Sequence, residues 1–178
     1  MANQPSTIAE LPWLALDTYR EEYRDLSDTW RNLDAKAQGI GAIAGIFLAA
    51  LFAWARDIPA SFGLTLRVLA VASIVLLVAS IVVAVVALRV RRVAAPPLGD
   101  ATGDMVRDIL RKQRPEELGD RLVALCNDQI ELWKATNADM AGVSEIKACR
   151  IGVAQGALVL AAVLVSILAI VVMLIPTA

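Results

Sequence analysis

Basic residues at helical spacing are the strongest candidates for ligand chemistry in this sequence. Arg107, Arg111 and Arg114 would share one face of a helix, and Lys112 lies beside them. A guanidinium group binds phosphate oxygens through two parallel hydrogen bonds, so this cluster is a candidate site for a phosphate-bearing ligand. The simpler alternative is that the four side chains contact anionic lipid headgroups and keep this segment cytoplasmic.

Catalytic and metal chemistry find few suitable residues here. The chain has no histidine, which removes the commonest general base and a common metal ligand. It contains no Gly-x-x-x-x-Gly-Lys phosphate loop, no Gly-x-Ser-x-Gly elbow and no His-Glu-x-x-His motif. Two cysteines, Cys126 and Cys149, are expected to be packing residues. We therefore predict a protein that is not an enzyme and that needs no metal or cofactor.

Three long apolar blocks decide the class of the protein. Hydrophobic residues make up 58% of the 178 residues, against about 45–50% in soluble domains. Residues 37–55, 68–88 and 151–175 contain no charged side chain. A helix needs about 20 apolar residues to cross a bilayer, with a range of about 17–25. We therefore predict an all-α membrane protein with three transmembrane helices, and disfavour three buried helices of a soluble bundle.

The distribution of Lys and Arg predicts the orientation of these spans. Four basic residues precede the first block, two lie between the first two blocks, eleven lie between 89 and 150, and none follows the third block. Because Lys and Arg favour the cytoplasmic side, we expect the N-terminus inside and the C-terminus outside. The expected segments are an N-terminal tail (1–16), a cytoplasmic amphipathic helix (17–38), a first span (39–55), an outer loop (56–67), a second span (68–88), a cytoplasmic helical segment (89–150), a third span (151–175) and an outer tail (176–178).

Both polar segments have the apolar spacing of packed helices. Asp17 and Thr18 suit the start of the first helix, and no Pro or Gly follows before Gly39, so it is expected to run into the first span. Pro115 suits the first position of a second helix, which is expected to continue into the third span. The expected seams are Tyr19, Tyr23, Leu26, Trp30, Leu33, Ala37 and Ile40 in the first helix, and Leu118, Leu122, Leu125, Gln129, Leu132, Thr136, Met140, Val143 and Ile146 in the second. These seams predict a coiled-coil-like cytoplasmic head, in which they pack on each other or on a second copy.

Small residues recur at every fourth position in two of the spans. Gly41 and Gly45 do so in the first span, and Gly152 and Gly156 in the third. Small faces let helix backbones approach closely, either within one chain or between copies. Two such faces in one small protein favour a homo-oligomer.

Polar side chains inside the spans are few. Ser73 and Ser80 share a face of the second span, and Gln155 lies in the third. The serines are most simply explained by hydrogen bonds to carbonyls of their own helix. If several copies form a pore, these three residues are the candidates to line it.

Charged and aromatic residues mark the point where the first helix enters the membrane. Trp30 belongs to the first seam, and Asp34 and Lys36 follow it just before the apolar block. Asp34 can reach Arg31, Gln38 or a neighbouring helix, and Lys36 can extend to the headgroups. We expect these residues to act at an interface or in gating.

The order of elements resembles that of small transmembrane effectors of bacterial anti-phage signalling systems. The phrase "LDAKAQGIGAIAG" enters the first span, and Asp34, Lys36 and Ala37 form the D-x-K-A phrase of the Pycsar transmembrane effector family, which the chain resembles. Effectors of the SLATT type and the membrane effector of the Hailong system are similar in size and span content.

This resemblance implies an inner-membrane protein that permeabilises or depolarises the bacterial membrane. Its signal would be a cyclic nucleotide or short oligonucleotide made by a partner cyclase or nucleotidyltransferase. Its other partners would be its own copies and membrane lipids, and no binding of duplex DNA is expected. The alternative function is a non-conducting scaffold or accessory subunit that recruits a cytoplasmic partner.

Overall fold

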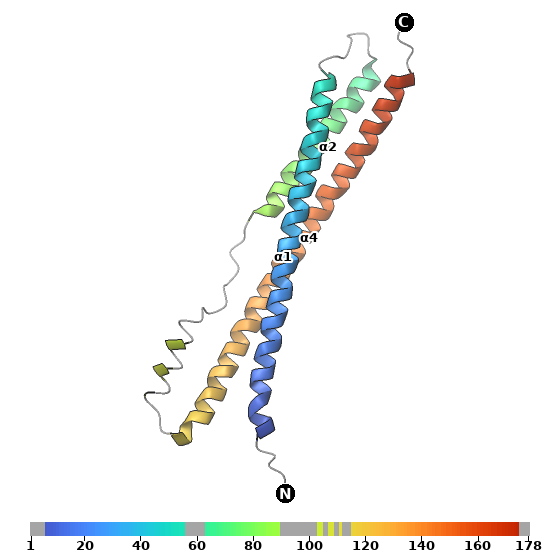
Figure 1. Cartoon of the computed structure of the whole chain (residues 1–178). Helices are drawn as coiled ribbons and strands as arrows, with labels where there is room; N and C mark the ends of the chain where they lie inside the picture. Colours follow the sequence, from blue (N-terminus) through green and yellow to red (C-terminus); the bar gives the residue numbers. More distant parts are fainter. Residues whose placement is uncertain are drawn as a thin grey trace. The chain divides into compact units, whose positions relative to one another are not determined.

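The protein is built from three long helices. The structure, a computed structural model, describes residues 6–55, 63–89 and 115–174 together with Gly103, Asp104, Arg107, Asp108 and Arg111, and side chains within these ranges from 12 and from 119. The helices are α1 (Ser6–Ala55), α2 (Leu64–Leu88) and α4 (Pro115–Leu174), and the described part of the chain contains no strand (Figure 1). All three are long and apolar enough to cross a membrane. The predicted all-α membrane fold with three spans is confirmed.

Helix α1 begins earlier than the sequence indicates. It starts at Ser6 and includes Pro12, so residues 6–16 of the expected tail are helical. Thr18 does not cap a helix start, because its Oγ1 donates to the carbonyl of Leu14, four residues earlier, at 3.0 Å. Leu16 is only 2% exposed, and burial of this side chain explains why the helix extends upstream of the expected start.

Helices α1 and α4 run without interruption from the polar segments into the apolar blocks. Helix α1 has 50 residues and α4 has 60, which at about 1.5 Å per residue gives lengths of about 75 and 90 Å. Helix α4 begins at Pro115, as expected. Helix α2 begins at Leu64, so residues 64–67 of the expected outer loop are helical. The expected linker at 94–104 lies almost wholly outside the described residues.

The chain divides into two compact units. The head unit comprises Met1–Trp30 and Arg91–Ser144, and the span unit comprises Arg31–Val90 and Glu145–Ala178. Helices α1 and α4 contribute to both units, whereas α2 belongs to the span unit alone. The three apolar blocks therefore meet in one unit.

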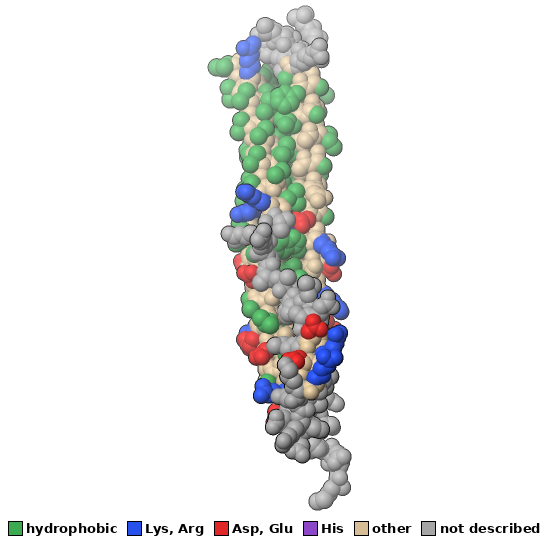
Figure 2. Space-filling model, turned by 90° about the vertical axis from the view of Figure 1, so that its left-hand side faces the viewer, with side chains coloured by type: hydrophobic (Ala, Val, Ile, Leu, Met, Phe, Trp, Pro, Cys, Tyr) green, Lys and Arg blue, Asp and Glu red, His purple; other side chains and the backbone are tan. Residues whose placement is uncertain are grey.

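The core of the span unit follows a seven-residue repeat in every helix. Buried positions alternate at spacings of three and four residues, which lets each helix keep one face toward its neighbours. Seven of the fourteen residues in this core are alanines, so the helices lie close together. Figure 2 shows hydrophobic side chains on the outside of this unit, as expected for a surface in contact with lipid. The core residues are Ala37, Ile40, Ala44 and Leu51 of α1, Leu66, Ala70, Leu77, Ala84 and Ala87 of α2, and Ile151, Ala154, Leu158, Ala161 and Leu168 of α4.

The head unit has a smaller and more polar core. Its buried apolar residues are Leu16, Leu125, Cys126 and Met140. Thr136, Asn137 and Ser144 of α4 are also buried, with 4%, 3% and 7% of their surface exposed. Such groups cost stability unless they find hydrogen-bond partners, so their contacts identify candidate functional positions.

Candidate functional site

A buried asparagine joins α4 to α1 in the head unit. The Nδ2 of Asn137 donates to the carbonyl of Tyr19 and to Oε2 of Glu22, both at 2.9 Å. Its Oδ1 is also buried, and among the described residues it accepts no hydrogen bond. The contact therefore fixes the two helices relative to each other but leaves one polar atom unsatisfied.

An aromatic pair lies one turn from this asparagine. Tyr23 of α1 and Trp133 of α4 meet edge to face, with ring centroids 5.3 Å apart and planes at 77°. Edge-to-face pairs contribute about 0.5–1.5 kcal/mol beyond the area that they bury. The head contact thus combines one specific polar interaction with one aromatic interaction.

Cys126 carries a buried thiol in the head unit. Only 1% of its surface is exposed, and this burial raises the pKa of the thiol, against a smaller opposing effect of Arg20. A thiol in this state is a poor nucleophile, because the thiolate is the reactive form. Cys126 therefore acts as a packing residue, as expected, whereas Cys149 is exposed and the expectation that it packs was wrong.

An ion pair joins α1 to α4 in the span unit, beside the apolar core. The Nζ of Lys147 lies 2.5 Å from Oδ1 of Asp34. The Lys147 side chain is 5% exposed and that of Asp34 is 32% exposed. Ala37 and Ile151, one turn further along the two helices, are core residues. The pair thus stands at the boundary between charged and apolar sequence, where its electrostatic attraction is screened less than at an open surface.

Helix α2 is held against α4 by two hydrogen bonds. The hydroxyl of Ser80 donates to the carbonyl of Ala154 at 2.8 Å, and Nη1 of Arg150 donates to the carbonyl of Val86 at 3.5 Å. These contacts place α2 and α4 antiparallel. Val86 is in the last turn of α2, and its carbonyl also accepts the backbone N–H of Arg89 at 3.3 Å, so Arg150 supplies a second donor and a positive charge at this helix end.

The two candidate pore-lining serines make different contacts. Ser73 donates to the carbonyl of Leu69 in its own helix at 2.8 Å, as the simple explanation requires. Ser80 instead bonds to α4. Both serines are 0% exposed in the single chain, whereas Gln155 lies on the exposed surface of α4. The sequence-based candidates therefore occupy two different environments.

The four glycines proposed for helix contacts face open space. Gly41 and Gly45 are partly exposed, and Gly152 and Gly156 are exposed. A Cβ added at any of them would meet no heavy atom of another described side chain or helix within 4 Å. These faces are consequently not used for packing against other described parts of the same chain.

The remaining predicted residues are scattered. Trp30 is half-buried in the head unit, and Lys36 is exposed. Arg107 and Arg111 are helical and exposed, and Arg107 lies 3.3 Å from Asp104 in a pair whose side chains are about three-quarters exposed. Lys112 and Arg114 lie outside the described residues. Among the predicted residues that the structure describes, Asp34 forms an ion pair with another helix.

Sequence reasoning missed Asn137 and Lys147. It expected the seam of α4 to pass through Leu132 and Ile146, but these side chains are 48% and 43% exposed. The expected Thr136 and Met140 are buried, but beyond them the buried positions lie one residue further on than expected, at Ser144 and Lys147. The seam there is polar, so a search for apolar spacing cannot follow it. These positions can be found by extending the buried repeat of the third span toward the N-terminus. Steps of three and four residues back from Ala154 and Ile151 lead to Lys147, Ser144, Met140 and Asn137.

Comparison with known proteins identifies the family. A family model described as the Pycsar effector protein domain matches residues 18–176. No curated protein and no solved structure matches the chain. The family match covers all three spans and both polar segments, and it agrees with the membrane helices of the structure. The chain therefore belongs to the Pycsar effector protein family and is a membrane effector of anti-phage defence.

Proposed function

We propose that this protein is a homo-oligomeric effector that permeabilises or depolarises the bacterial inner membrane when a nucleotide binds its head. The N-terminus and the head lie in the cytoplasm, and the C-terminus lies outside. The nucleotide is a cyclic mononucleotide or short oligonucleotide made by a partner enzyme. The family match supports the defence role, and the arrangement of charges supports the orientation.

The continuity of α1 and α4 is the observation that carries this proposal. Each helix runs through both units without a break, and Gly142 is the only glycine of α4 within several residues of the unit boundary at Ser144. A displacement of α4 against α1 in the head is therefore transmitted along the same two helices into the spans. Proteins with a flexible linker at this point would lose such coupling.

The contacts of Asn137 and Lys147 are the elements that a ligand would bias. A ligand shifts a conformational equilibrium only by its difference in affinity for the two states, and each 1.4 kcal/mol of difference is about tenfold. Buried polar contacts suit such a switch because their energy depends on geometry and on access of water. The unpartnered Oδ1 of Asn137 lowers the net stability that this contact contributes, which suits an element that a ligand shifts.

Candidate residues for the ligand and for the pore remain those that the sequence indicates. We assign the phosphate of the ligand to Arg107, Arg111, Lys112 and Arg114. Ser73 and Ser80 reach a pore only if α2 turns away from α4, because both are buried in the single chain. Gln155 needs no such movement, since it is already on the surface.

The test is ion flux from liposomes that contain purified protein of known oligomeric state. Potassium release is measured with and without cyclic mononucleotides and short oligonucleotides. We expect flux that depends on one class of nucleotide. The double variant Arg107→Gln/Arg111→Gln should need at least about tenfold more nucleotide, because two charge-assisted contacts are lost. Arg121→Gln, which removes another exposed arginine of the head, is the matched control.

Liposomes without anionic lipid separate the two possible roles of the basic residues. If the double variant responds normally to nucleotide but binds anionic vesicles less well, these arginines contact lipid headgroups. No flux under any condition, from folded and oligomeric protein, would contradict the proposed pore and favour a scaffold that recruits a cytoplasmic protein.

A further inference from the structure

Gln155 is a polar residue on the exposed surface of the third apolar block, where apolar side chains are expected. Its amide is exposed on α4, and among the described residues it has no hydrogen-bond partner. The bond from Ser80 to the carbonyl of Ala154 places this residue level with Ser80 of α2. Ser80 precedes the end of α2 at Leu88 by eight residues, which corresponds to about 12 Å along the helix.

This position lies inside the hydrocarbon core of a bilayer. Helix α2 has 25 residues and is about 37 Å long, and the hydrocarbon core is about 30 Å thick. A centred helix therefore extends beyond the core by about 4 Å at each end, and Gln155 lies about 8 Å below the core surface. An amide exposed to lipid at this depth is unfavourable, since lipid offers no hydrogen bonds.

The amide belongs to a second stripe on α4, beside the one that packs in the core. Its positions follow the same alternation of three and four residues, and its side chains are small or polar apart from one valine. The stripe consists of Gly152, Gln155, Val159, Ala162, Ser166 and Ala169. It includes both polar residues of the third span, Gln155 and Ser166.

The second stripe differs from the rest of the exposed surface of α4. Apart from Gly156, the other exposed positions of this span carry large side chains, such as Leu160, Ile167 and Ile170, which are 51%, 43% and 57% exposed. At Gly152 the space that a Cβ would occupy is open. A helix can therefore approach this stripe closely, whereas large side chains hold a helix away elsewhere.

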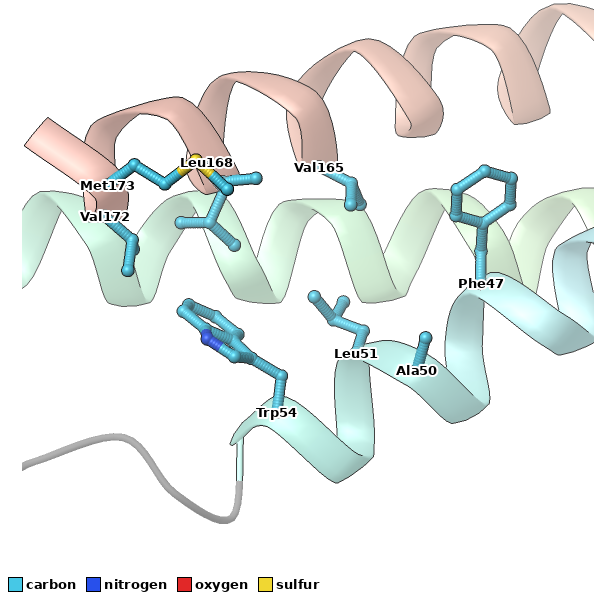
Figure 3. Close-up of a pocket in the computed structure, with 9 residues that line it drawn as sticks. Phe47, Ala50, Leu51, Trp54, Val165, Leu168, Val172 and Met173 are labelled. Atoms are coloured by element: carbon cyan, nitrogen blue, oxygen red, sulfur yellow. The ribbon is translucent and has the colours of Figure 1, made fainter.

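An apolar groove continues the second stripe toward the C-terminal end of α4. It has a volume of about 300 Å³ and lies between α1 and α4 (Figure 3). Phe47, Leu51 and Trp54 of α1 and Leu168, Ala169 and Val172 of α4 line it. Ala169 belongs to both the stripe and the groove, so the two form one continuous surface.

We propose that the occupant of the second stripe is α4 of a second copy, with the two Gln155 amides hydrogen-bonded to each other within the bilayer. Copies inserted in the same orientation present the same residue at the same depth, so an amide meets an amide. Each amide is both a donor and an acceptor, which makes the pair self-complementary. A lipid chain could fill the groove but would leave both amides unsatisfied. This inference rests on the homo-oligomer of the proposed function and specifies its contact.

Cysteine cross-linking in membranes tests the contact. Single cysteines are introduced in a chain that carries Cys126→Ala and Cys149→Ala. Val159→Cys and Ala162→Cys lie on the second stripe, whereas Leu160→Cys and Ile167→Cys are exposed controls at similar depth. We expect oxidation to link the first two into dimers at least about tenfold faster than the controls, because disulfides need Cβ atoms within about 4.5 Å.

A second measurement addresses the amide itself. Gln155→Leu should weaken association in detergent or liposomes by about threefold to tenfold. Ser166→Ala is the matched control, because the Ser166 hydroxyl already donates to the carbonyl of Ala162 at 2.8 Å. It should leave association nearly unchanged, and Gln155→Asn should restore part of it.

The outcomes separate this contact from the proposed function. Equal cross-linking at all four positions, no cross-linking in a chain shown to be oligomeric, or a strictly monomeric chain would each overturn the α4 contact. Potassium flux is measured on the same liposomes. Flux without cross-linking at the second stripe would refute the α4 contact but support the proposed pore. Cross-linking without flux would support the α4 contact but contradict the proposed pore.

Discussion

Removing the carboxylate of Asp34 is the most informative single change in this protein. The Lys147 ammonium is almost completely buried and the structure places it 2.5 Å from that carboxylate, whereas Asp34 is 32% exposed. The two partners are therefore not equivalent. Asp34→Asn removes the charge that faces a buried ammonium, whereas Lys147→Met removes the buried charge itself and leaves a carboxylate whose Oδ1 is buried but whose side chain is still 32% exposed to water.

The magnitude follows from this asymmetry. Removing one partner of a fully buried pair costs about 3–5 kcal/mol, because the remaining charge stays in a medium of low polarity. Since Asp34 is partly exposed, we expect a smaller loss for Asp34→Asn, about 2–3 kcal/mol, or roughly 30- to 150-fold in the unfolding equilibrium. Lys147→Met should cost about 1 kcal/mol or less, because the apolar methionine side chain suits the buried site. The double variant should resemble Lys147→Met.

The assay is unfolding of the purified protein by dodecyl sulfate, followed by circular dichroism and tryptophan fluorescence. A double-mutant cycle isolates the interaction between the two side chains. Arg20→Gln, which removes one partner of an exposed pair with Asp17, is the control and should change the free energy of unfolding by less than about 0.5 kcal/mol. The reasoning fails if Lys147→Met destabilises as much as Asp34→Asn, or if the two effects add in the double variant.

Three further predictions concern buried polar groups. Ser80→Ala should lower the free energy of unfolding by about 0.5–1.5 kcal/mol, and Ser73→Ala by less, because only the Ser80 hydroxyl bonds to another helix. Unfolding of both variants by dodecyl sulfate measures the difference. Asn137→Ala should cost about 1–3 kcal/mol, measured in the same way, since it removes two partly buried hydrogen bonds to α1, one of them to the Glu22 carboxylate. Burial raises the pKa of the Cys126 thiol, so at about pH 8 Cys126 should react with a maleimide at least about tenfold more slowly than exposed Cys149. Mass spectrometry measures both rates, and equal rates would contradict the prediction. Raising the pH should increase the rate at Cys126 only as its thiolate forms.

Much of the fold could be predicted from the sequence because apolar blocks, helix breakers and basic residues act locally. The absence of a break before Gly39 predicted the long α1, and Pro115 predicted the start of α4. The start of α1 at Ser6 could not be found in this way, because Thr18 resembles a cap and only the burial of Leu16 shows that the helix continues upstream.

The polar contacts were harder to predict than the helices. Asp34 was identified as a residue of interest, but its partner Lys147 was not, because a lysine in a charged segment is usually exposed. Asn137 was missed because a polar side chain in a polar segment is likewise usually exposed. Pairing of residues more than a hundred positions apart depends on the phase of both helices, and one residue of error in that phase exchanges a buried position for an exposed one.

The alanine-rich core of the span unit also determines how readily its helices can rearrange. A core of interlocking large side chains must expand before helices move past one another, and this raises the barrier. Alanine and serine project little beyond the backbone, so the contacts of Ala44, Ala84 and Ala154 are nearly flat. Larger buried side chains such as Leu77 and Leu168 are widely spaced along the helices. When one helix slides along another, only these few side chains have to be displaced. The spans are thus closely packed, and yet the small side chains of their core present a low barrier to movement of the helices along their axes.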